Sequence, residues 1–199
     1  MIPRPLTPLT ALALAATLAA CGDAEPEPEP AIDGATCGAA GARQEVTSEG
    51  QRHLAEGTAI DYSSNPPCIG DHFPIWLEWG VYDAPVDPGY YVHNLEHGGV
   101  AFLYDCPEGC PEIAQALIDF ANSIPADDGG PFRFVVMPFD GDMPARVAAV
   151  AWGKVYTNDC VNPDELAAFV ADNYRKAPED VAVNGIRPGV DTPLPDNDD

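Results

Sequence analysis

The chain is short of positive charge. Its 199 residues include 9 lysines and arginines against 32 aspartates and glutamates, which gives a formal net charge of −23 at pH 7. A protein that binds nucleic acid needs a face rich in lysine or arginine, and so does a protein that adheres to anionic lipid. The composition therefore argues against nucleic acid as a partner. By itself the charge favours solubility and the attraction of cations, and it specifies no activity.

The sequence also lacks an apolar run long enough for a membrane-spanning helix, which needs about 20 residues. The longest mostly apolar stretch, Leu9–Ala20, follows the single charge of Arg4 and ends in small residues directly before Cys21. Such a stretch is typical of a signal peptide. The ending Leu-Ala-Ala-Cys is a lipobox pattern, in which cleavage leaves the cysteine first and its sulfur receives a lipid. We predict a signal peptide over residues 1–20 and lipidation of Cys21, with an ordinary secretory peptide as the alternative.

The segment after the predicted cleavage site is a candidate tether. Residues 21–36 include Asp23–Pro30, an alternation of acidic residues and prolines that stiffens and extends the chain. We expect an extracytoplasmic protein, periplasmic or at the cell surface, anchored to a bacterial membrane through its N-terminal lipid. The sequence does not identify a protein partner. One globular domain is expected over residues 37–185, and a disordered acidic tail over residues 186–199.

The six cysteines of an exported chain would meet oxidising surroundings. If Cys21 is lipidated, five remain, so at least one thiol is free, bound to metal or paired with another molecule. The sequence leaves the connectivity open. The five are Cys37, Cys68, Cys106, Cys110 and Cys160.

Three short apolar runs in the second half of the chain are typical of buried strands. They are Val100–Tyr104, Phe132–Met137 and Val147–Trp152. Helices are expected to begin at Pro111 and Pro163, each followed by apolar residues at helical spacing. The order strand, helix, strand, strand, helix predicts an α/β (α+β) sandwich, a single small domain around one central sheet.

The first half of the domain, Cys37–Tyr91, is predicted to be a long loop-rich segment. Asn65-Pro66-Pro67 and Asp87-Pro88-Gly89 are turn signals, and the apolar residues between them show no periodic spacing. Loops on a rigid sheet often carry binding or catalytic residues. Trp76 and Trp79 are expected to pack this segment onto the sheet.

The histidines gather in or directly after this segment, and none follows His97. His93 and His97 share one face of a helix at this spacing, and one face of a strand too, so both rings can approach one ion. Neutral imidazole is the commonest metal ligand. We predict a transition-metal site, with copper or zinc as the expected metal, formed by His72, His93 and His97. Weaker ligand candidates are His53, Glu96 and Met137.

Several alternatives stay open at this cluster. Glu96 suits a ligand, a partner that orients a ring, or a general base, so the sequence does not decide between an enzyme and a metal-handling protein. Sulfur from Cys68 or Met137 would favour copper. Structural histidines would instead shape, with the two tryptophans, the pocket of a metal-free binding module. The His-x-x-Glu-His spacing also occurs in inverted zinc peptidases, but the flanking residues leave room for only about one turn of the long helix those enzymes need.

A second candidate site lies between the first predicted strand and its helix. The run Cys106-Pro-Glu-Gly-Cys110-Pro resembles the strand–Cys-Pro-x-x-Cys-Pro–helix motif of Sco-type copper chaperones, which have a thioredoxin fold. Cysteines at a helix N-terminus have lowered thiol pKa values. A thiol–disulfide or copper-transfer protein is therefore the rival hypothesis. Those chaperones need a histidine far downstream, which is absent here, and a structural disulfide is the simpler interpretation.

Several blocks together resemble one bacterial family, catalogued only as a domain of unknown function. Its signature is a Pro-Pro-Thr-Ser-Gly-x-His loop and a His-x-Leu-Glu-His-Gly segment, and the resemblance runs from about His53 to Tyr174. It implies an exported or membrane-anchored protein and no particular activity; Cys68-Ile69 departs from the usual Thr-Ser. The matching blocks are Asn65-Pro66-Pro67-x-x-Gly70-x-His72, Gly80-x-Tyr82, His93-x-Leu95-Glu96-His97-Gly98 and Ala151-Trp152-Gly153.

Overall fold

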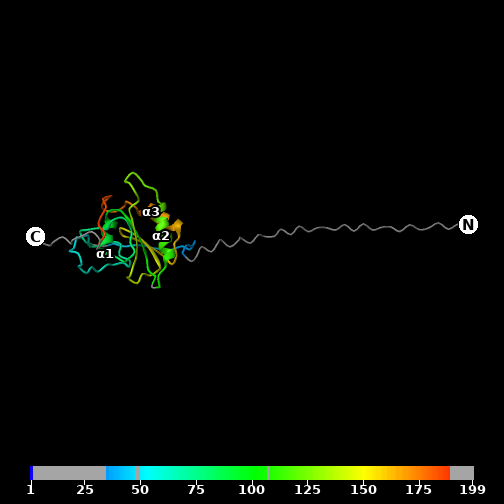
Figure 1. Ribbon diagram of the computed structural model, residues 1–199, viewed down its shortest axis with the longest axis horizontal. Helices are drawn as coiled ribbons and strands as arrows, with labels where there is room; N and C mark the ends of the chain where they lie inside the picture. The colour runs from blue at the N-terminus through cyan, green and yellow to red at the C-terminus, as the bar shows by residue number, and fades with distance from the viewer. Residues whose placement is uncertain (2–34, 48–49, 107, 189–199) are drawn as a thin grey trace. The chain divides into compact units, whose positions relative to one another are not determined.

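The computed structural model describes Met1 and residues 35–47, 50–106 and 108–188 (Figure 1). The predicted signal peptide after Met1, Cys21, most of the predicted tether and the tail from residue 189 lie outside these residues. Within the described ranges, three helices and a six-stranded mixed sheet form one α+β domain, which confirms the predicted fold class. Among the helices of this described part, none has the length and apolar character needed to cross a bilayer.

The sheet has the strand order β1-β6-β5-β3-β4-β2. The central strand β3 pairs in parallel with β4 and antiparallel with β5. Strand β6 joins β5 to β1 through antiparallel pairs, and β2 adds a short parallel edge to β4. The strands are β1 Ala42–Glu45, β2 Gly80–Val81, β3 Val100–Tyr104, β4 Phe134–Pro138, β5 Val147–Ala151 and β6 Lys154–Asn158.

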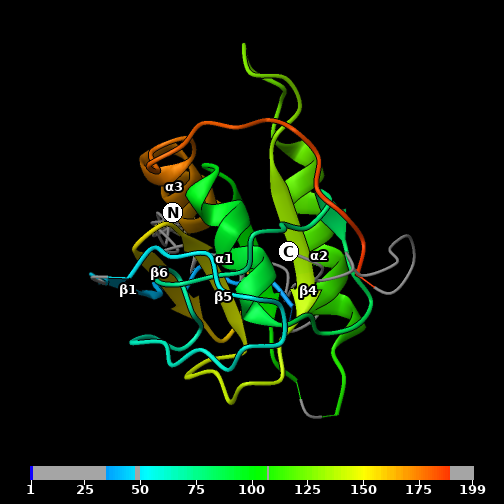
Figure 2. The ribbon, with the colours of Figure 1, turned by 90° about the vertical axis from the view of Figure 1, so that its left-hand side faces the viewer.

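Helices cover both faces of this sheet, because its strands are apolar on both sides. Helices α2, Pro111–Ser123, and α3, Pro163–Asn173, lie on one face with Phe102 of β3, and α1, Pro88–Glu96, lies on the other face with Leu103. Figures 1 and 2 show α1 on the opposite side of the strands from α2. Side chains that alternate along a strand point to opposite faces, so the continuous apolar run of β3 supplies two cores.

Helix α1 corrects the loop predicted up to Tyr91. Asp87-Pro88-Gly89 was interpreted as a turn, but the Asp87 carboxylate accepts a hydrogen bond of 2.8 Å from the Gly89 N–H and caps the helix, with Pro88 in its first turn. A Cβ at Gly89 would lie 2.6 Å from the Phe73 ring, so glycine permits this close approach. The helix has 9 residues, more than the single turn expected.

The sheet is larger than predicted, because three of its strands carry weak sequence signals. Strand β6 follows β5 through the two-residue turn Trp152-Gly153, in which Gly153 has a φ of 70°. Strand β1 is exposed at every residue, so it has no apolar pattern, and β2 has only two residues. Strand β4 begins at Phe134, two residues later than predicted, and extends through Pro138.

Contacts of the domain extend past both expected boundaries. Thr36 forms a β-bridge with Val161, one residue before the expected start at Cys37. At the other end, the Ile186 N–H donates to the Trp76 carbonyl at 3.0 Å, and the Arg187 guanidinium lies 2.7 Å from the Glu78 carboxylate. These contacts bring the segment after α3 back against the loops that precede α1.

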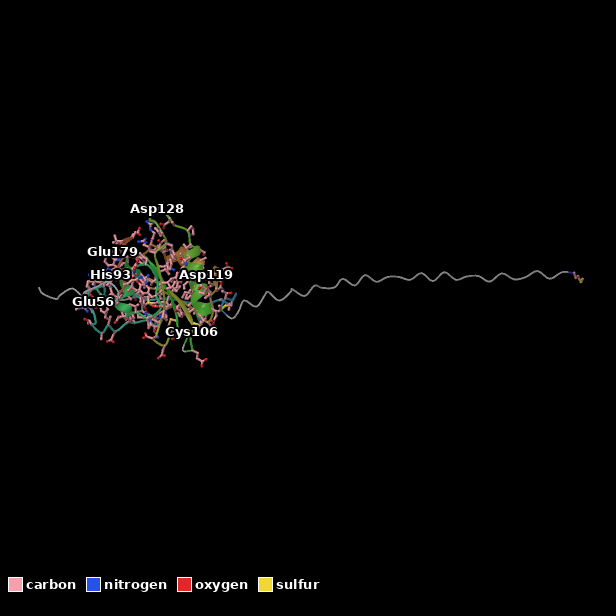
Figure 3. All side chains as sticks on the ribbon, viewed as in Figure 1. Glu56, His93, Cys106, Asp119, Asp128 and Glu179 are labelled. Carbon is pink, nitrogen blue, oxygen red and sulfur yellow. A yellow bond between two sulfur atoms is a disulfide. The ribbon has the colours of Figure 1, made fainter. Side chains whose placement is uncertain are left out.

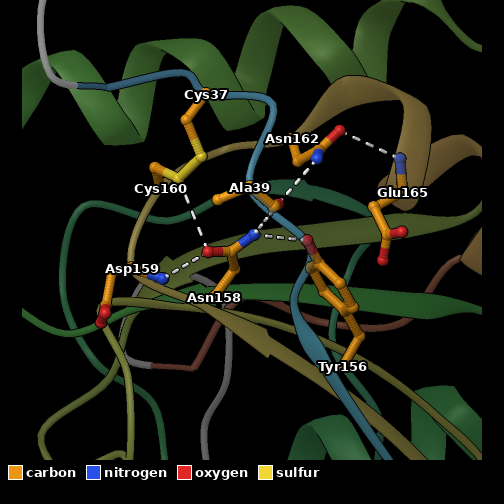
Figure 4. Close-up of a disulfide and its surroundings, with 8 residues drawn as sticks. All are labelled: Cys37, Ala39, Tyr156, Asn158, Asp159, Cys160, Asn162 and Glu165. Carbon is orange, nitrogen blue, oxygen red and sulfur yellow. Dashed lines mark hydrogen bonds between the residues drawn. A yellow bond between two sulfur atoms is a disulfide. The ribbon is translucent and has the colours of Figure 1, made fainter.

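The described cysteines form two disulfides, Cys37–Cys160 and Cys106–Cys110, and leave Cys68 as a free, buried thiol. Beside the first, the Asn158 amide donates to the Ala39 carbonyl at 2.9 Å and to the Tyr156 hydroxyl at 2.9 Å (Figure 4). The disulfide and these bonds fasten the N-terminal segment of the domain to β6. Among the described cysteines, the odd thiol expected from the count is thus Cys68.

Candidate metal centre

The last turn of α1 carries two of the clustered residues. His93 and Glu96 are buried on this turn, and His97 caps the helix with its backbone N–H bonded to the His93 carbonyl. Polar side chains are seldom buried without partners, because desolvation costs free energy. Buried at one helix end, these side chains therefore need polar partners within the protein.

The other two histidines come from the loops and lie side by side. His53 and His72 form a parallel β-bridge, flanked by the hydrogen bond from the Leu54 N–H to the His72 carbonyl at 2.8 Å. The neighbouring Arg52 guanidinium and Asp71 carboxylate, 2.6 Å apart, link the same two segments. Partners in a bridge point to the same side, so both imidazoles face α1.

A buried amide holds the loop after His72 against α1. The Asn94 side chain accepts from the Leu77 N–H and donates to the Leu77 carbonyl, both at 2.8 Å. The Phe73 N–H donates to the Gly89 carbonyl at 2.9 Å, at the other end of the helix. Sequence reasoning assigned no role to Asn94, although it stands inside the His-Asn-Leu-Glu-His block. Its fully buried position and satisfied amide fix the loop on the helix.

Four ligand atoms converge between the loops and the helix. One nitrogen of each of His53, His72 and His93 and one oxygen of Glu96 all lie within 4.8 Å of one another. The Glu96 carboxylate is 3.0 Å from Nε2 of His72 and 3.9 Å from Nε2 of His53. Three members are buried, whereas the His53 side chain is 52% exposed and forms the solvent side of the group.

Backbone carbonyls fix the tautomers of the two buried rings. Nδ1 of His93 lies 2.7 Å from the Phe73 carbonyl, and Nδ1 of His72 lies 2.9 Å from the Gly70 carbonyl. A carbonyl oxygen only accepts, so each Nδ1 carries a hydrogen and the Nε2 of the neutral ring presents a lone pair. This arrangement of an outer hydrogen bond and an inner lone pair is the one that metal-ligating histidines adopt.

Nε2 of His72 is a buried nitrogen with no hydrogen-bond partner among the described residues. It lies 3.0 Å from the Glu96 carboxylate, which is an ion-pair distance when the ring is protonated. In a neutral ring, this nitrogen and the carboxylate oxygen would face each other with lone pairs. A proton or a metal ion between them removes the repulsion, and the metal ion can also reach the other members of the group.

The charges of the group follow from burial and mutual contact. Burial lowers the pKa of His93 to about 4, so this ring is neutral near pH 7. Burial alone would lower the pKa of His72, but the Glu96 carboxylate and the Gly70 carbonyl raise it overall. Burial alone would raise the pKa of Glu96, but His72 and the surrounding rings lower it. Glu96 is thus an anion with imidazoles around it.

His97 lies beside this group but does not belong to it. Its Nε2 is 3.1 Å from Nε2 of His93 and 3.2 Å from the carboxylate of Glu179. The sequence placed His97 among three ligands and His53 and Glu96 among weaker candidates, whereas the structure gathers His53 and Glu96 with His72 and His93. Glu179 was not predicted, because the segment after α3 carries no motif.

The sulfur candidates lie apart from the four ligand atoms. Cys68 is fully buried, does not belong to the group, and has its Sγ 3.4 Å from the Ser64 hydroxyl. Burial raises the pKa of its thiol, which disfavours the thiolate that binds metals. Met137 is buried on β4 in the apolar cluster between the sheet and α1. The donors that converge are therefore nitrogen and oxygen.

Trp76 forms one wall of the cluster. Its ring centroid lies 5.0 Å from that of His93 and 4.5 Å from that of His97. The sequence predicted that Trp76 and Trp79 pack the loop onto the sheet; Trp79 contacts the apolar cluster beneath α1, and Trp76 contacts histidines. The indole N–H of Trp76 donates to the Val183 carbonyl at 3.1 Å, which ties this wall to the segment after α3.

The disulfide Cys106–Cys110 is a separate feature. It joins the end of β3 to the start of α2, where Cys110 is the N-cap residue and is buried. Figure 3 shows Cys106 and Asp119 on the α2 side of the domain, and His93 and Glu179 on the α1 side. The two candidate sites of the sequence therefore do not form one centre.

The fold and the cluster define a class: an α+β domain in which three histidines and a glutamate gather against the end of a short helix and could hold a metal ion. A family profile described as a protein of unknown function, DUF3105, matches residues 53–185. The chain belongs to this family, which bears out the resemblance to an uncharacterised domain family. The matched region begins at His53 and contains every residue of the cluster. No curated protein and no solved structure matches the chain.

Proposed function

We propose that this protein binds a transition-metal ion through His53, His72, His93 and Glu96. The observation that carries the proposal is Nε2 of His72: it belongs to a fully buried ring, has no hydrogen-bond partner among the described residues, and faces the Glu96 carboxylate at 3.0 Å. Desolvating this nitrogen beside a carboxylate costs free energy, which a shared proton or a coordinated cation offsets, and only the cation also uses the donors of His53 and His93.

The donor set favours zinc or divalent copper. Imidazole and carboxylate suit zinc, copper, iron and nickel in their divalent states, whereas thiolate and thioether ligands select monovalent copper. Cys68 does not belong to the converging group, and Met137 lies in an apolar cluster. A copper protein of this design would therefore hold the divalent ion.

The exposed edge of the site is relevant to whether the protein uses the ion in catalysis or transfers it to another molecule. His53 is the solvent-facing member of the group, and the other three members are buried. Four protein donors fill a tetrahedral ion, as in structural zinc sites, so a position open to solvent requires a fifth coordination position or withdrawal of the exposed His53. We propose Glu96 as a ligand rather than a general base, because histidines approach it from several directions.

Export and lipid attachment belong to the same proposal. The lipobox at Cys21 and the acidic, proline-rich segment behind it support a protein held outside the cytoplasm by an N-terminal lipid. The disulfides Cys37–Cys160 and Cys106–Cys110 support it too, because disulfides persist in oxidising compartments. Radiolabelled palmitate incorporated by the parent and not by Cys21→Ser would support the anchor, and equal labelling would refute it.

Elemental analysis of the exported chain, purified without a histidine tag, tests the metal proposal. We expect about one equivalent of metal per chain in the parent and in Glu112→Gln, whose carboxylate lies on α2. The double variant His72→Ala, His93→Ala is expected to hold none while keeping the parent circular dichroism spectrum. A parent that is empty and takes up neither zinc, copper nor iron on titration would refute the proposal and favour a metal-free binding module.

The Cys106–Cys110 disulfide carries a second candidate function, thiol–disulfide exchange or copper transfer. The observation that favours it is the position of Cys110 as the N-cap of α2, where the helix dipole stabilises a thiolate. Reduction by a mild dithiol with Cys37–Cys160 left intact would support this function. Resistance of Cys106–Cys110 up to the unfolding transition would identify a structural clip instead.

A further inference from the structure

Two acceptors compete for one N–H at His97. Its Nε2 is hydrogen-bonded to Nε2 of His93 at 3.1 Å, and the Glu179 carboxylate lies 3.2 Å from the same atom. Nε2 of His93 is the lone-pair nitrogen of its ring, because Nδ1 donates to the Phe73 carbonyl. A hydrogen bond between the two Nε2 atoms therefore requires that His97 carries the hydrogen on Nε2.

The lone pair that accepts this hydrogen is also the one that a metal ion needs. Nε2 of His93 cannot coordinate an ion and accept from His97 at the same time. When an ion binds, the N–H of His97 loses its acceptor in a buried place, since His97 is only 3% exposed. An unpaired buried donor costs about 1–3 kcal/mol, so the loaded site needs a second acceptor for this hydrogen.

Glu179 is in position to be that acceptor. Its backbone N–H donates to the Glu96 carbonyl at 3.0 Å, and the Val181 N–H donates to the His97 carbonyl at 3.3 Å, so its segment is fastened to the end of α1. The Trp76 ring lies against the His97 ring and restricts its movement. The Arg133 guanidinium donates to the His97 carbonyl at 2.9 Å and fixes the backbone.

We infer that Glu179 is a positioning residue of the metal site. When the ion binds to Nε2 of His93, the N–H of His97 changes its acceptor from His93 to the Glu179 carboxylate. The inference rests on the proposed function. His97 is then a neighbour that occupies the His93 lone pair in the empty protein, and it is not itself a ligand. Glu179 releases that lone pair by offering the N–H a negatively charged acceptor.

A double-mutant cycle on zinc affinity, measured by competition with a chromogenic chelator in the full chain, tests the inference. Glu179→Gln keeps the shape and removes the charge, and we expect its Kd to be about 10-fold weaker, the lower end of the range for partners of metal ligands. His97→Phe keeps a ring against Trp76 and removes the N–H. It should bind one ion at least as tightly as the parent, and in its background Glu179→Gln should change Kd by less than about 3-fold.

Three further measurements make the outcomes decisive. Glu112→Gln removes a similarly exposed carboxylate far from the cluster, and its Kd should equal that of the parent. The copper(II) electron paramagnetic resonance spectrum should be the same in the parent and His97→Phe, because the ligands are unchanged. His97→Ala repeats the test should the phenylalanine variant not fold.

The two proposals fail in different ways. Zinc binding by the parent with an empty His97→Phe site, or with a changed copper spectrum, would make His97 a ligand and overturn the inference. An equal effect of Glu179→Gln in both backgrounds would show a through-space charge effect and overturn it as well. A parent that binds no metal would refute the proposed function itself.

Discussion

At the scale of single residues, the buried rings of the cluster bond the backbone through their outer nitrogens and turn their inner nitrogens towards one another. The carbonyls of Gly70 and Phe73 occupy the outer nitrogens of His72 and His93. Their inner nitrogens, with the Glu96 carboxylate, face a common point. A structural polar network is normally satisfied throughout, so the unpartnered inner nitrogen of His72 is what separates this group from a core histidine cluster.

Glu96→Gln is the residue-scale test of the carboxylate. Removing the anion leaves three neutral donors, and a divalent ion loses its only charged ligand in the group. We expect the zinc Kd to weaken by at least 10-fold, with the circular dichroism spectrum unchanged. Titration against a chelator provides the measurement, with Glu112→Gln as the control for charge. An unchanged affinity would mean that Glu96 is not a ligand.

Asp180, which follows Glu179 and is not one of the converging ligands, gives a pH prediction. Its hydrogen bonds with Arg175 and Arg133 lower its pKa to about 2. A carboxyl whose folded pKa is depressed stabilises the fold above its ordinary pKa of about 3.9, and the contribution is lost as the pH falls through about 2. With metal removed by a chelator, Asp180→Asn should lower Tm at pH 6. The gap to the parent should close between about pH 4 and pH 2.

The control for this prediction is Asp119→Asn, whose carboxylate on α2 accepts a hydrogen bond of 2.8 Å from the Gln115 amide. Its Tm should follow that of the parent at every pH. The prediction for Asp180 would be contradicted by a Tm gap that stays constant down to pH 2, which would indicate a loss of packing in place of a lost charge. The Asp180 side chain is 45% exposed, so the expected gap is modest.

At the scale of elements, the N-terminal cap of α1 helps to fix the helix that carries the ligands His93 and Glu96. Asp87 caps this helix through the Gly89 N–H, as Asn162 caps α3 through the Glu165 N–H. Asp87→Ala should cost about 1 kcal/mol, which corresponds to a Tm lower by about 2–4 °C in a domain of this size. Thermal unfolding of the two variants measures this effect, and Asn162→Ala should lower Tm by at least as much as Asp87→Ala. An unchanged Tm in Asp87→Ala would contradict the cap assignment.

The same two caps show how far the sequence predicts the elements. Asn162-Pro163 and Asp87-Pro88 carry one signal, a capping residue followed by proline. The first was interpreted as a helix start because an apolar stripe follows it. The second was interpreted as a turn because Gly89 and a loop-rich context surround it. What selects the helix is tertiary: Gly89 admits the Phe73 ring, and the apolar side of α1 meets the sheet.

The candidate site was predictable in part for the same reason. Clustering in the sequence brought out the four histidines and Glu96, because residue type alone carries the signal for metal ligands. Which of them meet depends on the bridge between His53 and His72 and on the Asn94 amide, and these are long-range contacts without a motif. Glu179 comes from beyond α3, where no local pattern marks it.

At the scale of the whole molecule, the two disulfides should contribute differently to stability. Cys37–Cys160 closes a sequence separation of 123 residues, and Cys106–Cys110 one of 4. In the chain-entropy model, the first stabilises by about 5 kcal/mol and the second by about 2 kcal/mol. Denaturant unfolding of the two double-serine variants measures the difference. A larger loss for Cys106→Ser, Cys110→Ser would contradict this model.

Neither disulfide is expected to affect metal binding. The Cys37–Cys160 link fastens the N-terminal segment to β6, and the Cys106–Cys110 link lies at α2, on the other face of the sheet from α1. Neither touches the converging ligands, so zinc affinity of the folded variants should match that of the parent. A metal lost together with Cys106 and Cys110 would instead favour the copper-transfer alternative.

The most direct measurement of the central claim is X-ray absorption at the edge of the metal that the purified parent carries. The account predicts imidazole scattering from three rings and only nitrogen and oxygen in the first shell, at about 2.0–2.2 Å for zinc. The His97→Phe variant should give the same spectrum. A sulfur shell near about 2.3 Å, or a bound ion whose spectrum survives the His72→Ala, His93→Ala change, would contradict it.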